Sequence, residues 1–442
     1  MDRSPTEPFY EPFPRSSGPP PKGPDPVHVL AFRGAVTGAD AYRAVRSALR
    51  VEENVLRVGN RFVPADRYRE IAFVAVGHAA LSSALGICDA LGDRVTQGLV
   101  VGPDPVPPEV PFKAMRTTDA WPGDVEAEPS AAAILELANG LGERDLLILA
   151  ISPGALPWLA TPPKGRTGTG WAAWLRQAHT AGATGAEVAS LARLTGRGAV
   201  GGQLAIAAST ATVVPLLIDR GDGAAGVGGG PTLLPNDLER IGGRALLERT
   251  GLWSTMPAAE TALFAPHPGT PAKLGENVHR PVVVATPADA LRGAADSVGE
   301  RKYMPRLAAL SLSDPPEAAA ERFLQRVDAV VEENRVEMVD AGRKGIVAFA
   351  ALTLGLPEGV DEQPAFERFL VAVRSHVRRR ELTISLLRTK GASERGAPPG
   401  AVIGGAIVPG GSAGAARPLP MRSGITDVGL MAVALAPAST AG

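Results

Sequence analysis

Four loops of this chain combine glycine with polar side chains in a way that suits binding of a phosphate or a carboxylate. Each directly follows a predicted strand, and its glycines allow positive φ angles and close approach of the backbone to a ligand. A helix that begins after such a loop directs free N–H groups at an anion. The loops therefore predict an anion-binding site, although each taken alone also suits an ordinary turn. They are Gly77-His78, Ser152-Pro153-Gly154, Asp219-Arg220-Gly221-Asp222 with the stretch that ends Gly229-Gly230-Pro231-Thr232, and Thr389-Lys390-Gly391.

Several side chains in and near these loops leave more than one role open. His78 could be a weakened phosphate contact, a general base, or a residue left in a site that no longer turns over. Asp219 and Asp222 are spaced to share a Mg²⁺ ion or to orient a hydroxyl, and aspartate beside glycine is equally ordinary turn chemistry. Arg343 stands at the start of a helix predicted over 344–355, where it could grip a carboxylate or phosphate, or belong to a solvated charge pair.

Three other kinds of site are excluded by the sequence. Gly410-Gly411-Ser412-Ala413-Gly414 fits the nucleophile elbow of serine hydrolases. That elbow opens a helix and precedes its histidine, whereas Pro418 follows Ser412 and the last histidine is His376. No lysine stands in the context of a long phosphate loop, and the six histidines have no metal-ligand spacing. We therefore expect neither a hydrolase triad nor a metal centre built on histidines.

The elements that position the loops alternate along the chain. Short runs rich in Val, Ile and Leu are separated by stretches of helical period, which is typical of βα units around a parallel sheet. The predicted fold class is α/β, with two α/β domains that have Rossmann-like, mostly parallel sheets and flanking helices. Strands are expected over 71–77, 98–101, 145–151, 213–218, 282–285, 382–387 and 402–408, and helices over 79–91, 130–142, 171–182, 235–250, 288–298, 315–334, 344–355 and 364–379.

Proline marks the predicted domain boundaries. Residues 1–26 hold nine prolines, which predicts a disordered tail over 1–27. A second group of prolines breaks every period after the first set of βα units. We therefore expect an N-terminal α/β domain over 28–255, an interdomain crossing over 256–281 and a C-terminal α/β domain over 282–442.

Composition bounds the class of protein. The 442 residues carry 45 Lys and Arg against 46 Asp and Glu, so a nucleic-acid partner is not expected. The single cysteine, Cys88, allows no intramolecular disulfide. The sequence has no run of eighteen apolar residues and no basic-then-apolar start, so we expect a cytoplasmic protein with no membrane partner. A homodimer is left open.

A series of segments in order along the chain carries a resemblance to a known family. The first are AYRAVRSALRVEENVLRVG (41–59), IAFVAVGHAALSSAL (71–85), GLGERDLLILAISPGAL (140–156), LARLTGRGAVGGQLAIAA (191–208), VVPLLIDRGDG (213–223) and GGGPT (228–232). The later ones are TPADALRGAA (286–295), VDAGRKGIVAFAAL (339–352), ISLLRTKGASERGAPPGAVIGGAIV (384–408) and SGITDVGLMAVAL (423–435). Together they resemble the glycerate 2-kinase family, whose members carry a C-terminal MOFRL domain.

The resemblance implies a kinase that phosphorylates glycerate at its 2-hydroxyl, with ATP and Mg²⁺, in a cleft between the two domains. The implied partners are a small hydroxy acid and a nucleotide. The implied catalytic residues are His78 and Arg343. The residues implied to bind substrate or nucleotide are Gly77, Ser152, Gly154, Arg193, Asp219, Asp222, Gly230, Thr232 and Thr389.

Several positions depart from the motifs of that family. His78 replaces the lysine of a Gly-Ala-Gly-Lys-Ala loop, and histidine is mostly neutral at cellular pH. Pro153 removes a backbone N–H from a glycine-serine loop, and Val200 stands at a second lysine. An Asn-Gln-Glu trio after Arg343 has no match, and Lys390 replaces the aspartate of a Thr-Asp-Gly loop. The departures imply weak or lost turnover. The alternative is a non-catalytic pseudoenzyme that binds a metabolite or a partner in the same cleft, so whether the protein is an enzyme stays open.

Overall fold

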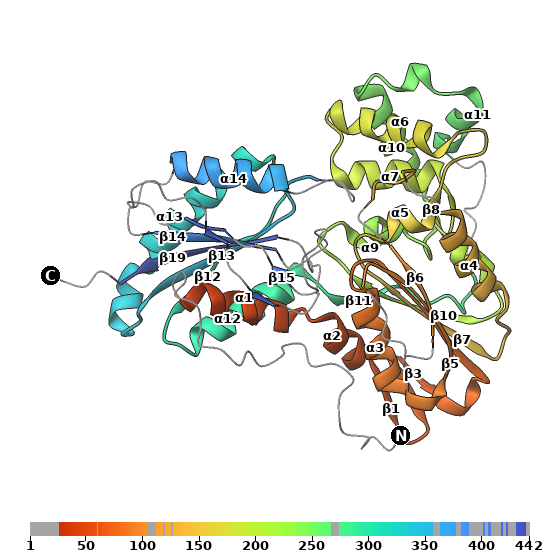
Figure 1. Cartoon of the computed structure of the whole chain (residues 1–442), viewed down its shortest axis with the longest axis horizontal. Coiled ribbons are helices and arrows are strands. Elements are labelled where there is room, and N and C mark those ends of the chain that lie inside the picture. The colour runs from red at the N-terminus through yellow and green to blue at the C-terminus, as the bar shows by residue number, and fades with distance from the viewer. Residues whose placement is uncertain are drawn as a thin grey trace. The chain divides into compact units, whose positions relative to one another are not determined.

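The computed structural model (Figure 1) consists of two compact units, each with its own main sheet. The first unit comprises the described residues of 41–284 with Leu356, and the second those of 26–40, 285–355 and 363–438. The structure describes residues 26–59, 61–104, 112–117, 120–124, 127–266, 274–356, 363–376, 382–388, 401–402, 405–407, 417–418, 421–422 and 430–438.

The first unit is built around a six-stranded sheet with the strand order β11-β10-β7-β4-β5-β6. The pairs β4–β5, β4–β7, β5–β6 and β7–β10 are parallel. From β4 the chain goes to β5 and β6 and then returns to the other side of β4 with β7, so the strand order reverses there. In open α/β sheets, the loops at such a reversal are where ligands bind. The strands are β4 (Glu70–Val76), β5 (Val95–Gly102), β6 (Lys113–Arg116), β7 (Asp145–Ile151), β10 (Thr212–Ile218) and β11 (Val282–Ala285).

Uninterrupted apolar sequence explains the central strands. Every residue of β7 and β10 is buried, because helices cover both faces of the sheet. Alternate residues of β4 enter different core clusters, Val74 and Val76 on one face and Phe73 and Ala75 on the other. The strands predicted over 71–77, 98–101, 145–151 and 213–218 are confirmed.

The helices of the first unit divide between the two faces. Residues of α2 and α3 pack with Phe73, whereas residues of α4, α6, α7 and α10 pack with Val74. The helices are α2 (Ala41–Ala48), α3 (Ala80–Leu91), α4 (Glu128–Asn139), α5 (Leu156–Leu159), α6 (Gly168–Thr180), α7 (Gly185–Thr195), α8 (Gln203–Ala207), α9 (Gly223–Gly226), α10 (Asp237–Arg249) and α11 (Ala258–Thr261). Two small antiparallel sheets complete the unit: β1 (Leu49–Glu52), β2 (Val55–Val58) and β3 (Arg61–Pro64), and β8 (Ala160–Thr161) with β9 (Arg197–Gly198).

Helix α7 is not among the predicted helices. Thr184 caps it, because its Oγ accepts from Glu187 N at 3.3 Å and Glu187 Oε2 accepts from Thr184 N at 2.8 Å. Val188, Leu191 and Ala192 are buried on its inner face. The Thr-x-x-Glu spacing is the sequence signal that identifies this helix.

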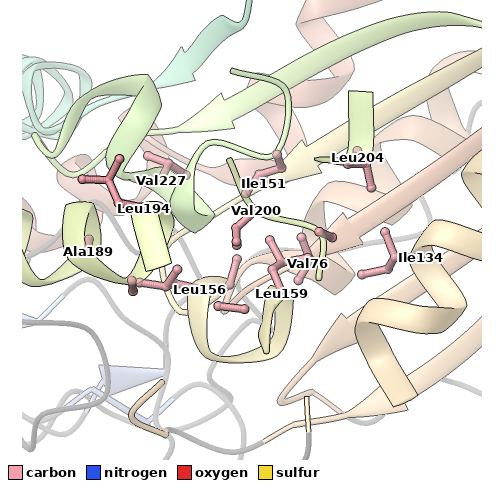
Figure 2. Packing of buried hydrophobic residues seen from close by; sticks show 14 of the residues in the cluster. Val76, Ile134, Ile151, Leu156, Leu159, Ala189, Leu194, Val200, Leu204 and Val227 are labelled. Atoms are coloured by element: carbon pink, nitrogen blue, oxygen red, sulfur yellow. The ribbon is translucent and has the colours of Figure 1, made fainter. Parts of the chain in front are cut away.

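Figure 2 shows the core directly beneath the carboxyl ends of β4 and β7. Val76 and Ile151, the last residues of those strands, lie close to Leu156, Leu159 and Val200 in one cluster of buried side chains. Close-packed interiors leave little freedom for the backbone that they support. The cluster therefore fixes the loops that follow the two strands.

The second unit has a six-stranded sheet with the order β12-β13-β19-β14-β16-β17. Only β12–β13 is parallel among these pairs, and the other four are antiparallel. The α/β class is confirmed, but this sheet differs from the mostly parallel one expected. Strand β19 lies between β13 and β14 and runs opposite to both, and its apolar sequence carries no signal of direction. The strands are β12 (Met304–Leu312), β13 (Gly345–Leu352), β14 (Thr383–Arg388), β16 (Gly405–Ile407), β17 (Arg417–Pro418) and β19 (Leu430–Pro437), with a separate pair, β15 (Ala401–Val402) and β18 (Met421–Arg422).

The helices of the second unit are α1 (Pro26–Gly38), α12 (Pro287–Gly299), α13 (Pro316–Asp340) and α14 (Gln363–His376). The last three match predicted helices. Within the part of the chain that the structure describes, no helix has the length and apolar character needed to cross a membrane.

The predicted helix over 344–355 is wrong, because these residues form strand β13. All eight residues of β13 are buried between β12 and β19. A short apolar run suits either a buried helix or a buried strand, and Ile346 and Val347 favour the strand through their branched side chains. Arg343 therefore precedes a strand and does not open a helix.

The unit boundaries differ from the predicted domains. Helix α1 packs on α12 in the second unit, although the predicted N-terminal domain begins at residue 28. The described part of 256–281, predicted as a crossing, lies in the first unit, where Phe264 of η5 (Ala262–Phe264) is buried in the core. Of the predicted tail, residues 1–25 lie outside the described residues, and Pro26 and Val27 begin α1.

Candidate functional site at the carboxyl edge of the parallel sheet

Strand register brings the first two glycine loops together. Val76 of β4 pairs with Ile151 of β7, so the following residues, Gly77 and Ser152, leave the sheet at the same level. A Cβ on Gly77 would lie 2.3 Å from the Ser152 carbonyl oxygen, and Gly77 has a φ of +110°. Only glycine fits this close approach of two loops.

Ser152 holds the two loops together from inside the protein. It is buried, and its Oγ accepts from Ala79 N at 3.0 Å and donates to the Val76 carbonyl at 3.2 Å. The carbonyl of Pro153 accepts from His78 N at 2.9 Å. Two N–H groups that precede helix α3 are therefore bonded within the protein, so they are not presented to an anion.

The His78 ring lies against the loop that follows β7. A Cβ on Gly154 would lie 2.4 Å from His78 Nε2, and Gly154 has a φ of +83°. Space and backbone conformation both require glycine here. The structure thus brings together Gly77, His78, Ser152 and Gly154, four of the predicted site residues.

Two charged residues at the same edge were missed by the sequence analysis. Asp104 follows β5 and Arg116 ends β6, where it pairs with Gly102. Burial raises the pKa of the Asp104 carboxyl to about 6, and the nearby charges of His78 and Arg116 offset part of that rise. The Gly102-Pro103-Asp104 sequence has the same glycine-polar pattern as the other loops and could have identified Asp104. Strand β6 has only four residues, so its sequence carries no such signal.

Asp219 and Asp222 at the end of β10 form a turn. Asp219 Oδ1 accepts from Gly221 N at 2.8 Å and Gly223 N at 3.1 Å, while Asp222 Oδ2 accepts from Arg220 Nε at 2.7 Å. Among the described residues, no group of three or more His, Cys, Asp or Glu side chains could hold a metal ion. The carboxylates of Asp219 and Asp222 help to hold this turn.

Arg193 and Gly230 are internal to the fold. The Arg193 side chain is buried, donates to the Leu233 carbonyl at 2.7 Å and pairs with Glu239. A Cβ on Gly230 would lie 2.9 Å from Arg193 Nε. Thr232, in the same stretch, is also buried. Arg193 thus fastens the stretch after Gly230 to helix α7, which is a structural role.

Val200, at the position of a lysine in the resembled family, is a core residue. It is buried beside Ile151, Leu156 and Leu159 in the cluster of Figure 2. A Cβ on Gly229 would meet Val200 Cγ1 at 3.0 Å. The position faces apolar side chains, so it contributes no charge.

The remaining predicted residues belong to the second unit. Arg343 N donates to the Met338 carbonyl at 3.0 Å, which closes the end of helix α13 after Gly342, whose φ is +59°. The Arg343 side chain is partly exposed. Thr389 lies outside the described residues.

A hollow of about 360 Å³ lies elsewhere on the first unit. Its lining includes Arg46, Arg50 and Asp89. Asp89 is nine residues beyond the start of α3, which is roughly 14 Å along a helix with a rise of about 1.5 Å per residue. The hollow is therefore separate from the edge that carries His78 and Asp104.

Together, the reversal in strand order and the glycine loops at the carboxyl edge define a doubly wound α/β protein. The chain belongs to the family described as "Domain of unknown function (DUF4147)", which matches residues 28–265. This domain is the N-terminal domain of glycerate 2-kinase family proteins. The resemblance is thereby confirmed for this part of the chain, and the MOFRL assignment of 282–442 stays a prediction.

Two solved structures share the fold. A glycerate kinase from Thermotoga maritima aligns with a TM-score of 0.65 and 16% identity, over 93% of this chain and 99% of that chain. The PH0495 protein from Pyrococcus horikoshii aligns with a TM-score of 0.62 and 16% identity, over 94% of this chain and 98% of that chain. No curated protein sequence matches the chain.

Proposed function

We propose that this protein is a glycerate-2-kinase-like phosphotransferase with low turnover, which transfers the γ-phosphoryl group of ATP to a short hydroxy acid such as glycerate. The observation that carries the proposal is the meeting of the Gly77-His78 and Ser152-Gly154 loops at the strand-order reversal. Membership of a family whose domain occurs in glycerate 2-kinases supports it, as does the fold shared with a glycerate kinase.

The chain's own residues would act mainly by positioning. Gly77 and Gly154 let the two loops pack against each other, which holds His78 at the edge of the sheet, and His78 would contact a phosphate when its imidazole is protonated. Asp219 and Asp222 would act by holding the turn after β10 through their hydrogen bonds. Arg343 and Thr389 stay predicted site residues of the second unit.

Low turnover follows from missing positive charge and missing donors. Phosphoryl transfer depends on positioning and on stabilisation of charge, and loss of one such donor commonly lowers kcat by about 10²–10³. His78 replaces a permanent cation, and Val200 places an apolar side chain at a second lysine position. The N–H groups of His78 and Ala79 are already bonded to Pro153 and Ser152.

The same hydrogen bonds support a second candidate function, a non-catalytic protein that binds the metabolite or a partner. A turn whose donors are satisfied internally holds its shape without a ligand. Such a protein would bind a hydroxy acid or a nucleotide without consuming ATP.

The test is hydroxy-acid-dependent release of ADP from ATP by the full chain. We expect slow release that requires glycerate and is lost in His78→Ala. His279→Ala is the matched control, since His279 N bonds to Val213 at the opposite end of β10. Glycerate binding without any release of ADP would favour the non-catalytic protein, and equal loss in both variants would remove the special role of His78.

A further inference from the structure

We propose that Asp104 and Arg116 form the subsite for the acceptor, in which the Arg116 guanidinium binds the carboxylate of a short 2-hydroxy acid and the Asp104 carboxylate accepts the hydrogen bond of its hydroxyl. This inference rests on the proposed function, because it names the residues that hold the group to be phosphorylated.

Strand order places the two residues at the ends of neighbouring strands. In β5 and β6, Gly102 pairs with Arg116, and in β4 and β5, Val76 pairs with Val101. Neighbouring strands lie about 4.8 Å apart, so the ends of β6, β5 and β4 follow one another in short steps along one edge. Gly77 N donates to the Val101 carbonyl at 3.0 Å, and a Cβ on Gly102 would lie 2.9 Å from Ala80 Cβ. The loop that bears Asp104 therefore packs directly on the loop that bears His78.

Asp104 differs from the other aspartates at this edge in its hydrogen bonding and its surroundings. Asp219 and Asp222 are engaged in hydrogen bonds, whereas the Asp104 carboxylate has no hydrogen bond or ion pair within the described ranges. It is partly buried and interacts electrostatically with His78 and Arg116. A partly desolvated carboxylate between two basic groups is suited to accept a proton from a ligand hydroxyl near neutral pH.

The pairing of a basic and an acidic side chain at neighbouring strand ends suits a 2-hydroxy acid as the acceptor. Its carboxylate and hydroxyl stand on adjacent carbons, so one short molecule offers an anionic group to Arg116 and a hydroxyl to Asp104. During transfer, the hydroxyl oxygen would form the new bond to the γ-phosphorus of ATP. The bond between that phosphorus and the β–γ bridging oxygen would break with its electron pair leaving on ADP. The hydroxyl proton would pass to Asp104 and then to solvent.

The test compares binding of D-glycerate and lactate with binding of propionate, which lacks the hydroxyl, by calorimetry at pH 7.5. We expect the hydroxy acids to bind about tenfold to a hundredfold more tightly, as for a hydrogen bond to a charged group. Asp104→Asn should reduce this preference to a few-fold, and Arg116→Gln should weaken all three ligands. Asp93→Asn and Lys113→Gln are matched controls, because both residues are exposed and lie at the amino ends of β5 and β6.

The outcomes separate this subsite from the proposed function. A preference for hydroxy acids that depends on Asp104, without any release of ADP, would support the subsite and contradict the proposed kinase activity. Phosphorylation of glycerate with unchanged KM in both variants would support the kinase activity and contradict the subsite. Arg116 is exposed, so Arg116→Gln should keep its fold and gives a second test of the subsite that does not depend on Asp104. Equal binding of lactate and propionate by the unmodified chain also overturns the proposal.

Discussion

The contact between His78 and Gly154 leaves no room for a side chain in the turn after β7. We expect Gly154→Ala to destabilise the protein by about 1–3 kcal/mol from the positive φ alone, with a further loss from the clash. Gly165→Ala is the matched control, since Gly165 has a φ of +88° and a Cβ there would have no neighbour within 4 Å. Urea unfolding of both variants should show the larger loss for Gly154→Ala. Equal losses would mean that His78 moves away at little cost.

A contact between two residues of the site can be predicted from the sequence only where the strand topology imposes it. Gly77 and Ser152 follow strands whose carboxyl ends share an edge, so their meeting could be predicted. The hydrogen bond from Ala79 N to Ser152 Oγ could not, because it depends on the rotamer of a buried hydroxyl. Arg193 was predicted to bind substrate or nucleotide and pairs with Glu239 46 residues further along the chain, a contact with no sequence signal.

Helices α1 and α12 pack closely at glycines, and this contact connects α1 to the rest of the second unit. A Cβ on Gly293 would lie 2.2 Å from the Gly34 carbonyl oxygen. We expect Gly293→Ala to lower the melting temperature even though alanine favours a helix by about 1 kcal/mol over glycine. Gly242→Ala, in α10 with open space around it, should instead raise the melting temperature. A higher melting temperature in both variants would show that the packing of α1 does not require glycine at residue 293.

Elements with a periodic or capped sequence were predictable, and those defined by long-range pairing were not. The buried runs of β4 and β7 sit among helical stretches that specify parallel βα units. Strand β13 has an equally apolar sequence, but its strand conformation depends on β19, which pairs Leu430–Pro437 with Gly345–Leu352. Strand β19 lies about 80 residues further along the chain, so the local residue pattern around β13 could not distinguish a strand from a helix.

The stability of the whole molecule should depend on pH through Asp104. The pKa of this carboxyl rises from 3.8 to about 6 on folding, so the folded state favours the protonated form. The associated stability is present below pH 4 and is lost as pH rises through about 6. We expect Asp104→Asn to be more stable than the unmodified chain at pH 7.5, by about 1–3 kcal/mol, and the gain to shrink at pH 4.5. Urea unfolding at both values of pH, with Asp93→Asn as control, measures the difference. A gain that is equal at the two values would contradict this account.

We expect that turnover can be restored only by several changes at once, since the departures from the family's motifs lie in separate segments of the sequence. His78→Lys returns one cation, but Pro153 would still lack the backbone N–H that a glycine there would supply, and Lys390 would keep its reversed charge. Residues that act as a unit are strongly non-additive, so we expect the single change to leave ADP release nearly unaltered. His78→Lys, Pro153→Gly and Lys390→Asp together should raise glycerate-dependent release by about 10²-fold or more, as expected for electrostatic groups in phosphoryl transfer. A coupled assay across the single, double and triple variants measures this. A large gain from His78→Lys alone would show that charge at residue 78 is the sole deficit, and no gain in a folded triple variant would favour the non-catalytic protein.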